Sequence, residues 1–278
     1  KTKRRKIIKN LLLNTLAASG LIYFSFQLLW GFNYQRLPLA KILKLDVHNS
    51  TSIELEHLCK DLITSSNTLR KKINQNRNGV MELSYNKKII LETAHIGYEN
   101  ASFQYIILKG TYGTPKGLLL SEPMCYTGIT GFYFPFTSEA NINMAEPDSY
   151  LPFTTCHEMA HQIGFAKEDE ANYIAYVACI NNPDINFKYS GTLAALTYSL
   201  SSLRQYDPQK YKELFAFCSK GVLNDMIYNE NFWEGYSGRI EKISEELNNT
   251  YLKSASQRSG IKSYSAMVDF LLANYRKK

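Results

Sequence analysis

The sequence predicts an α+β domain that follows an N-terminal transmembrane helix. Three observations lead to this prediction: an uncharged stretch at 11–30, short β-type runs between residues 87 and 136, and a helical pattern from Pro152 almost to the end. A small sheet before a helical second half is typical of an α+β domain. The chain has 278 residues and is 45% hydrophobic, so it can bury a substantial core.

The positive charge of the chain is concentrated at its N-terminus. The formal net charge is +7, and six of the basic side chains are Lys1, Lys3, Arg4, Arg5, Lys6 and Lys9. Residues 10–278 therefore carry only about +1. A nucleic-acid surface needs basic residues clustered on the folded part, so we expect no nucleic-acid partner. Binding through the basic arm alone explains less, because the apolar stretch beside it already accounts for the arm.

Residues 11–30 read LLLNTLAASGLIYFSFQLLW and contain no charged side chain. A helix of this length spans about 30 Å, the thickness of the hydrocarbon core of a bilayer. Trp30 and Tyr34 stand where an interfacial aromatic belt is expected. The positive-inside rule then assigns residues 1–36 to a cytoplasmic arm and membrane helix, and residues 37–278 to an extracytoplasmic domain.

A cleaved signal peptide or a buried helix of a soluble protein could also produce such an apolar stretch. No small-x-small cleavage site follows the stretch closely, and a buried helix seldom has six charges beside it. We therefore predict a retained span in the cell membrane. Because the chain begins with Lys rather than Met, we also expect further residues upstream, with room for further spans.

The region after the span divides into a helix, several strands and a series of helices. Apolar residues recur at helical spacing from about Ser52 to Asn74. We predict strands at KKIILETAH (87–95), SFQYIILKG (102–110), KGLLLSE (116–122) and ITGFYFPF (129–136). The segment from Gly131 to Met144 either borders a cleft as an edge strand that pairs with an extended peptide, or lies inside the sheet.

The five cysteines are widely spaced and form no CxxC pair. We therefore expect buried free thiols. Cys156 directly precedes His157 and is the only one that could serve as an additional soft metal ligand. Neighbouring side chains on a helix point in different directions, which argues against that role.

Residues 157–161 read HEMAH, an HExxH motif. On a helix His157 and His161 project from one face one turn apart, so both imidazoles can reach the same zinc ion. Glu158 lies beside them, where it can take a proton from water. The alternative is two surface histidines on an ordinary helix.

The boundaries of this helix can also be predicted. The hydroxyl of Thr154 or Thr155 can cap its start, and Pro152, just before them, is a second signal of a helix start. Gly164 is well placed to end it, and the next helix should begin near Glu168.

Zinc needs a third protein ligand. Metzincins place a third His six residues after the second, but Lys167 stands there and excludes that family. The sequence EDEAN at 168–172 instead resembles the ExxA[DN] element of the gluzincin peptidases. This resemblance implies that Glu168 is the ligand and that Asn172 braces a ligand histidine by a hydrogen bond.

Glu170 is the alternative third ligand. It is rotated by roughly 200° from Glu168, so we expect it to face solvent or the helix cap. Three acids in a first helical turn also complement the helix dipole without any metal. The link between His161 and Glu168 is shorter than in thermolysin-type enzymes, which argues against a thermolysin-like architecture.

Four segments carry a wider resemblance: LLWGFNYQRLPL (28–39), GFYFPFTSEANIN (131–143), PFTTCHEMAHQIGFAKEDEANYIAY (152–176) and NTYLKSASQRSGIKSYSAMVDFLLA (249–273). Together they resemble an uncharacterised bacterial family of membrane proteins with several N-terminal spans and an HExxH-containing domain. The resemblance implies a zincin-like catalytic domain with a small sheet, an active-site helix and a helical C-terminal half. It does not indicate a particular substrate.

These observations predict a membrane-anchored zinc metallopeptidase that acts on a peptide or protein substrate, with Glu158 as general base. The alternative is a non-catalytic zinc-binding sensor or scaffold of the cell envelope, which would not need Glu158. The donor that would stabilise an oxyanion is left open. The main candidates are Tyr236 and Arg239, followed by Tyr251, Tyr264 and His95.

Overall fold

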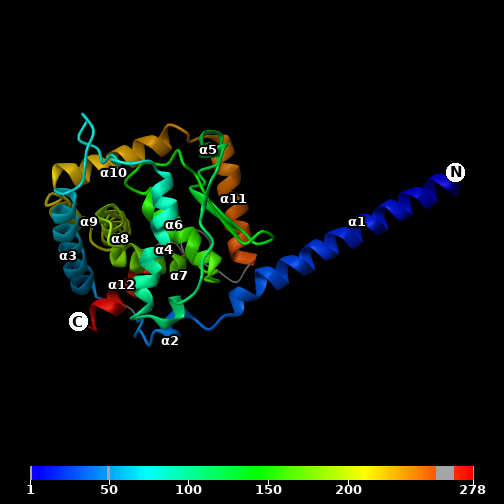
Figure 1. Cartoon of the computed structure of the whole chain (residues 1–278), viewed down its shortest axis with the longest axis horizontal. Coiled ribbons are helices and arrows are strands. Elements are labelled where there is room, and N and C mark those ends of the chain that lie inside the picture. Colours follow the sequence, from blue (N-terminus) through cyan, green and yellow to red (C-terminus); the bar gives the residue numbers. More distant parts are fainter. Residues whose placement is uncertain (1, 49–50, 255–265, 278) are drawn as a thin grey trace.

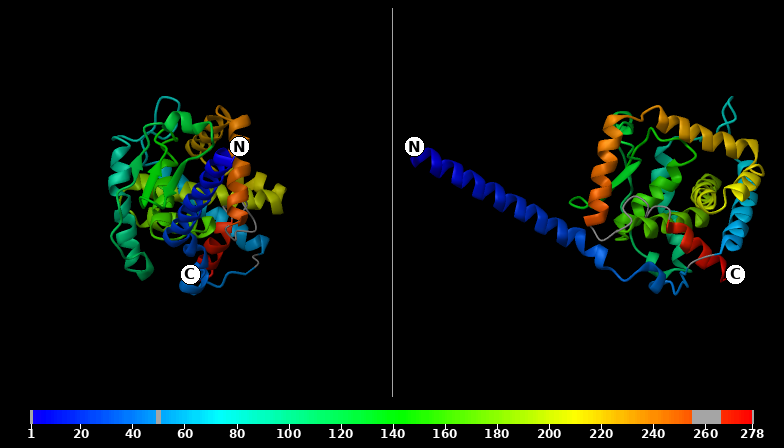
Figure 2. Two further views of the ribbon diagram at one scale, coloured as in Figure 1. Left: turned by 90° about the vertical axis from the view of Figure 1, so that its right-hand side faces the viewer. Right: turned by 180° about the vertical axis from the view of Figure 1, so that it is seen from behind.

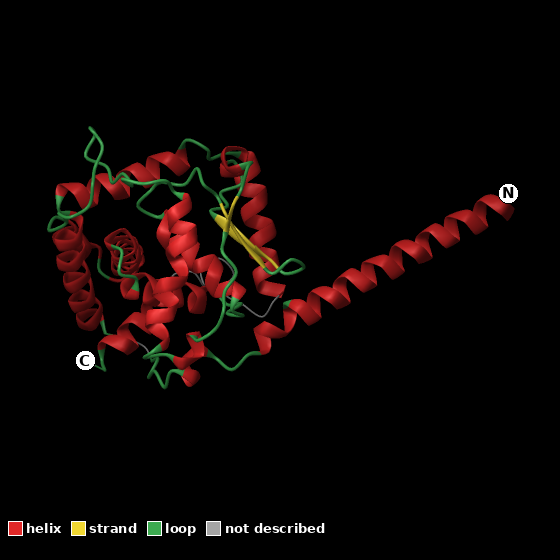
Figure 3. Cartoon of the chain, in the orientation of Figure 1, coloured by secondary structure: helices red, strands yellow, loops and turns green. Residues whose placement is uncertain are grey.

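The computed structural model describes residues 2–48, 51–254 and 266–277 (Figure 1). The fold is a mostly helical α+β arrangement with a small sheet (Figure 3). The first half contains α1 (Thr2–Leu29), η1 (Gly31–Gln35), α2 (Leu39–Ile42), α3 (Ser52–Arg70), α4 (Lys88–Ser102), η2 (Ile106–Leu108), β1 (Lys116–Gly117), α5 (Ser121–Cys125), β2 (Gly131–Phe134) and β3 (Glu139–Ile142), where η denotes a 3-10 helix. The second half contains α6 (Leu151–Gln162), α7 (Glu168–Asn181), α8 (Ile185–Tyr206), α9 (Pro208–Phe215), α10 (Lys220–Glu234), α11 (Arg239–Ser254) and α12 (Met267–Tyr275).

Helix α1 extends away from the rest of the molecule as a single rod (Figures 1 and 2). Its stretch Lys3–Leu29 is long and apolar enough to cross a membrane, a test that a signal sequence would also pass. The predicted span at 11–30 lies within this helix except for its last residue, Trp30, which is buried against the domain. The side of the membrane on which each end lies, and the division after residue 36, stay predictions.

Two of the predicted strands are wrong. Residues 88–102 form helix α4, which replaces the strand expected at 87–95. The apolar side chains of this segment fit a helix, because Ile90, Leu91, Ala94 and Tyr98 are buried on one face at helical spacing. The segment 102–110 contains the end of α4 and the short helix η2 instead of a strand.

The sheet is smaller than the sequence predicts. The expected strand at 116–122 is reduced to β1, because the chain turns into α5 at Ser121. The strand expected at 129–136 is confirmed as β2, and β3 follows it as an antiparallel partner. The strand order is β1-β3-β2, with β1 parallel to β3, so β2 lies at an edge of the sheet.

The core is formed by helices that surround α6 and α7. Helix α4 packs on both of them, α8 packs on α7 and α3, and the sheet lies against α6. The predicted helix after Ser52 is confirmed as α3, whose first turn is stabilised by a capping box between Thr51 and Glu54. All five cysteines are buried free thiols, as predicted. The fold therefore places α6, which carries the HEMAH sequence, between the sheet and the other helices.

Candidate metal centre

Helix α6 crosses the interior and is buried along most of its length. Pro152 occupies its first turn, where the missing N–H costs no hydrogen bond. The predicted cap by Thr154 or Thr155 is wrong, because both residues lie inside the helix. Thr155 Oγ1 donates to the Leu151 carbonyl at 2.7 Å, and Thr154 Oγ1 donates to a carboxylate oxygen of Glu146 at 2.9 Å.

A tight turn returns the chain from α6 to α7. Gly164 has a φ of +91°, a conformation that favours glycine, and its N–H donates to the His161 carbonyl at 2.9 Å. Phe165 N–H donates to the Ala160 carbonyl at 3.1 Å. Helix α7 then begins at Glu168, as predicted. The short link therefore directs the first side chain of α7 toward the histidines of α6.

Three potential ligand atoms converge between these two helices. His157 Nε2 lies 3.1 Å from His161 Nε2, and Glu168 Oε2 lies 3.2 Å and 3.4 Å from the same two nitrogens. Ligand atoms at the corners of a zinc tetrahedron are separated by roughly 3.3–3.4 Å, given zinc–ligand bonds of about 2.0–2.1 Å. The three side chains are buried. This buried group could therefore hold a metal ion.

The orientation of His161 is set by its other ring nitrogen. Nδ1 lies 2.7 Å from the Phe165 carbonyl oxygen, so an N–H at this position donates to that oxygen. The lone pair then belongs to Nε2, which faces Glu168 and His157. Such a hydrogen bond selects the tautomer and the ring position that a metal ligand needs.

The charges at the centre favour an anionic third ligand. Burial opposes ionisation of Glu168, but the nearby His161 and His157 outweigh it and hold the pKa of this carboxyl well below its usual range. Burial also opposes a charge on His161, yet Glu168 and Glu158 raise the pKa of that imidazole. The carboxylate is thus stabilised in its charged form, which is the form that binds a metal.

Glu158 lies beside the ligand group and is buried as well, with 4% of its surface exposed. Its Oε2 has no hydrogen-bond partner among the described residues. Burial raises the pKa of this carboxyl, against the effect of His157 and His161. A Cβ added to Gly131 of β2 would lie 2.7 Å from Glu158 Cγ and 2.9 Å from its Oε1. The glycine therefore makes room for this side chain next to the edge strand.

Asn172 lies one turn after Glu168 on α7 and is buried. It lines a pocket together with His157, which is where the predicted bracing residue should be. Burial raises the pKa of the nearby Tyr198 to about 12, and a hydrogen bond with Asn172 opposes this rise. Bracing of a ligand histidine by Asn172 stays a prediction.

Of the two positions expected for Glu170, solvent is wrong, and the side chain lies at the helix cap beside Lys167. This side chain is buried, and its Oε1 accepts a hydrogen bond from the backbone N–H of Leu39 at 2.9 Å. Lys167 forms an ion pair with the same oxygen at 3.5 Å. The segment after α1 folds over the start of α7 and covers Glu170, a long-range contact that helical periodicity cannot reveal.

His157, His161 and Glu168 form what we call the metal group. This group opens into a cleft of about 1000 Å³. One wall is β2, which is the edge strand, and another is α11, whose side chains Ile240, Ile243 and Leu247 line the cleft. The third wall is the end of α1 with Trp30 and η1. Figure 1 shows α11 beside the sheet, on the side from which α1 leaves the domain.

Two tyrosines near the metal group come from distant parts of the chain. Tyr34 Oη lies 3.0 Å from Tyr251 Oη, and Trp30 Nε1 donates to Tyr251 Oη at 3.1 Å. Burial raises the pKa of Tyr34 far above its ordinary value, and the nearby Tyr251 and Glu168 add to this rise. Sequence reasoning missed Trp30 and Tyr34 as cleft residues, because their aromatic character also fits a membrane interface.

The other candidate donors lie elsewhere. Tyr236 packs on Tyr126 with ring centroids 5.0 Å apart and does not line the cleft. Arg239 is exposed at the first residue of α11 and is also outside the lining. His95 is exposed beside Glu99 on α4. Tyr264 lies outside the described residues. Of the predicted donors that the structure describes, only Tyr251 lines the cleft.

A family model described as "Protein of unknown function (DUF3810)" matches residues 1–272. The chain belongs to the DUF3810 family. The match includes α1, both helices of the metal centre and α11, and it confirms the expected membership of an uncharacterised family. A search of curated proteins and a search of solved structures each found no match.

Proposed function

We propose that this chain is a membrane-anchored, zinc-dependent metallopeptidase with a zincin-like domain. The observation that carries the proposal is the convergence of His157, His161 and Glu168 on one point, with Glu158 buried beside it. Two imidazoles and one carboxylate are the ligand set of the HExxH–Glu zinc peptidases, and three protein ligands leave a position open for water. When bound, zinc would supply a Lewis acid that acidifies water and polarises a carbonyl oxygen.

Glu158 is the proposed general base. Its Oε2 has no competing hydrogen bond within the described residues, so it is available to accept a proton from the attacking water. Burial raises the pKa of Glu158, which brings it closer to the pH at which an enzyme works, as general acid–base catalysis favours. The same carboxyl can then deliver the proton to the leaving amine. A purely structural zinc site would not need this residue, which argues against the sensor or scaffold alternative.

The cleft suits an extended peptide. Among the described residues, strand β2 is paired on one side only, and it lines the cleft, so its other edge can form main-chain hydrogen bonds with a substrate strand. The hydroxyls of Tyr34 and Tyr251 lie 3.0 Å apart and both residues line the cleft, with Tyr34 close enough to Glu168 to feel its charge. Because the pKa of Tyr34 is raised, this hydroxyl keeps its proton and can donate to a developing oxyanion.

The site lies next to the end of α1, so the proposal includes a membrane anchor. Trp30 follows α1 directly, and its ring centroid lies 5.7 Å from that of His161. If α1 spans a membrane, the scissile bond must be presented close to the membrane surface. We propose, from the basic N-terminal residues, that this surface is extracytoplasmic.

The test uses the full chain in detergent, loaded with zinc and incubated with a peptide library. We expect peptide-bond cleavage, detected by mass spectrometry, that falls by at least about a hundredfold in Glu158→Gln while bound zinc is unchanged. The control is Glu99→Gln, which changes an exposed carboxyl on α4 and should retain activity. Equal cleavage by wild type and Glu158→Gln would refute the mechanism. Zinc binding without any cleavage would favour the sensor or scaffold.

A further inference from the structure

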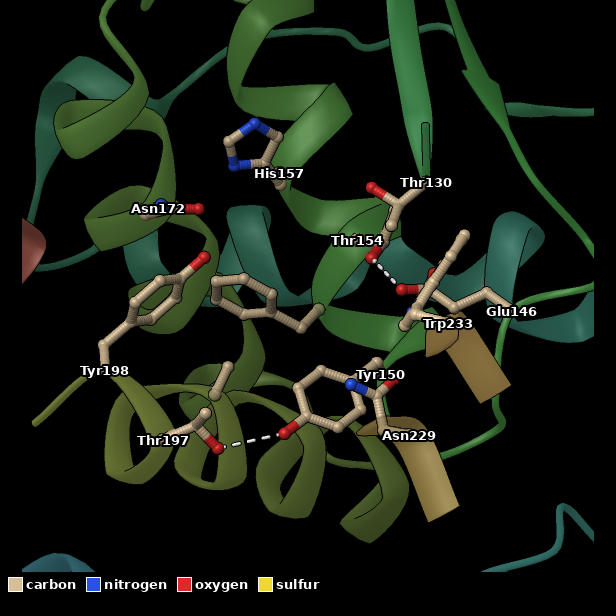
Figure 4. A pocket seen from close by; sticks show the side chains of 12 residues that line it. Thr130, Glu146, Tyr150, Thr154, His157, Asn172, Thr197, Tyr198, Asn229 and Trp233 are labelled. Atoms are coloured by element: carbon tan, nitrogen blue, oxygen red, sulfur yellow. Dashed lines mark hydrogen bonds between the residues drawn. The ribbon is translucent and has the colours of Figure 1, made fainter. Parts of the chain in front are cut away.

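A second pocket, of about 280 Å³, opens beside the metal group (Figure 4). His157 and Thr130 line both this pocket and the large cleft, so the two spaces meet at a metal-ligand residue. Its volume is just below the roughly 300–1,000 Å³ of small-molecule sites. A pocket of this size next to a peptide-binding cleft suits one side chain rather than a length of peptide.

The pocket is lined by the acidic side chain of Glu146, which is only 2% exposed. One of its oxygens accepts a hydrogen bond from Thr154 at 2.9 Å. The other, Oε2, is buried with no hydrogen-bond partner among the described residues. Asn229 adds a second buried acceptor, because its Oδ1 also has no partner in the described part of the chain. The pocket thus offers hydrogen-bond acceptors that lack donors.

Lys87, whose charge acts on Glu146, forms its ion pair with Asp148 instead. Lys87 Nζ donates to the carbonyl oxygens of Glu146 at 2.7 Å and Met144 at 3.0 Å, and it pairs with Asp148 at 3.0 Å. These three contacts use the three donors of the ammonium group. The lining residues include no Lys or Arg. A buried carboxyl without a counter-ion costs stability, so a purely structural role would be served better by glutamine.

The walls of the pocket are aromatic. Trp233, Tyr150 and Tyr198 line it together with Glu146, and Figure 4 labels all four among the lining side chains. Aromatic faces attract ammonium and guanidinium groups as well as apolar stems. Burial raises the pKa of Glu146 to about 8, although Thr154 and Lys87 oppose the rise. A cationic guest would favour the charged form of this carboxyl and so relieve the cost of its burial.

The distance from the metal group fits a long side chain. Thr154, which donates a hydrogen bond to Glu146, lies on α6 three residues before His157. Three residues correspond to about 4.5 Å along the helix axis. A lysine side chain reaches its charge through a flexible stem of four carbons. A residue bound at the metal group could therefore extend such a stem into the pocket.

We propose that this pocket binds the side chain of a lysine or arginine residue next to the scissile bond, with Glu146 as its counter-ion. The inference rests on the proposed peptidase function for the position of the scissile bond. It names the substrate class: polypeptides with a basic residue at the cleavage site.

The first experiment measures binding without metal and without catalysis. The chain contains two tryptophans, Trp30 in the large cleft and Trp233 in the pocket. We expect n-butylammonium to change the fluorescence of the full, metal-free chain in a saturable way, whereas its uncharged isostere n-butanol should not. Trp233→Phe should remove this signal and Glu146→Gln should abolish the saturation. Equal responses to both probes, or an unchanged titration in Glu146→Gln, would overturn the proposal.

The second experiment measures specificity in the zinc-loaded chain. Matched peptides carry Lys, Arg, Gln, Glu or norleucine on either side of the scissile bond. We expect kcat/KM to favour Lys or Arg over norleucine by at least about tenfold, the discrimination expected for a charged hydrogen bond. Glu146→Gln should reduce this preference, while the exposed-site control Glu122→Gln should keep it.

The outcomes separate the two proposals. Cleavage without preference for a basic residue would refute the pocket assignment and leave the peptidase function standing. Saturable binding of n-butylammonium without any peptide cleavage would refute the peptidase function and leave the cation site standing. Circular dichroism of Glu146→Gln, compared with wild type, shows whether a lost titration reflects a lost fold.

Discussion

Two buried clusters of charged side chains, both within the described residues, differ in the direction of their hydrogen bonds. In the first, the carboxylate of Asp225 on α10 accepts from Arg70 Nε at 2.6 Å, from the Met81 N–H at 2.7 Å and from the Tyr189 hydroxyl at 2.5 Å. In the second, the ligand atoms of His157 and Glu168, together with that of His161, face one another around a single point.

The difference shows why burial of charge does not by itself indicate a functional site. At Asp225 the donors come from the protein itself, so the charge is neutralised and the cluster holds α3, α8 and α10 together. At the metal group the converging atoms are acceptors when the imidazoles are neutral, and a cation can satisfy all of them. The first cluster is complete within the fold, whereas a metal ion would complete the second under the proposed function.

The strongest effect should separate two carboxylates of the same helix. Glu168→Ala should lower zinc affinity by at least about a hundredfold, the upper end of the loss for changing a residue that only supports a ligand, because it removes the proposed third ligand itself. Glu170→Ala should leave the zinc content near that of wild type. It should instead lower the free energy of unfolding by about 1–3 kcal/mol, because the buried N–H of Leu39 loses its acceptor. Metal content after dialysis and denaturant unfolding measure the two effects.

If Glu170→Ala lost the metal and Glu168→Ala kept it, the assignment of the third ligand would be wrong. The similarity of residues 168–172 to the gluzincin element would then carry no information on the ligands. The two variants have the same change of charge, so each serves as the matched control of the other.

The next effect concerns the cluster that is complete within the fold. Asp225→Ala leaves Arg70 buried without its partner and should lower the free energy of unfolding by about 3–5 kcal/mol. The zinc bound per folded chain should not change, since neither residue lines the cleft. Glu56→Ala, which removes partly exposed ion pairs with Lys60 and Lys210, should lower the free energy of unfolding far less than Asp225→Ala does. A loss of zinc in folded Asp225→Ala would show that the two clusters are coupled.

A third prediction tests a buried carboxyl that belongs to neither cluster. The pKa of Glu146 is about 8 in the folded chain, against 4.5 for an ordinary glutamate, chiefly because of burial. The folded state therefore favours the protonated form, and this contribution to stability is fully present below about pH 4.5 and is lost as the pH rises to about 8. Lys87 and Glu158 are the charged groups that influence it.

Glu146→Gln removes this titration. Across the same pH range, wild type should lose on the order of 4 kcal/mol of unfolding free energy relative to the variant. Denaturant unfolding at several pH values, without added metal, measures the difference. Parallel stability curves for the two proteins would show that Glu146 keeps an ordinary pKa.

The weakest effect concerns the space that Gly131 leaves for Glu158. A Cβ at this position would come within 2.7 Å of Glu158 Cγ and 2.9 Å of the Asn141 carbonyl oxygen. Gly131→Ala should therefore displace the proposed base and lower kcat by about ten- to a hundredfold, while zinc content stays constant. Gly238→Ala is the matched control, because nothing lies within 4 Å of its added Cβ. Unchanged kcat in Gly131→Ala would show that the base tolerates the shift.

Local patterns predicted the helical elements of the second half well. Helical spacing and Gly164 predicted the end of α6 and the start of α7 at Glu168. The strands were predicted poorly, because short apolar runs such as 87–95 occur in buried helices as well as in sheets. The prediction of Thr154 and Thr155 as caps was wrong, because threonine hydroxyls inside a buried helix can also form hydrogen bonds. Thr155 donates to a carbonyl of its own helix, and Thr154 donates to a neighbouring carboxylate.

Short-range sequence information was sufficient for the apolar helix, the HExxH helix and the candidate third ligand, because each depends on residues within a few turns of one another. The surroundings of the metal group, in contrast, are set by tertiary packing. The fold brings Trp30 and Tyr251, which are 221 positions apart, into one hydrogen bond, and it covers Glu170 with the segment that contains Leu39. Contacts of this kind depend on how whole helices pack. Periodicity along one helix predicts which of its faces is buried, but it does not indicate which other segments pack against that face.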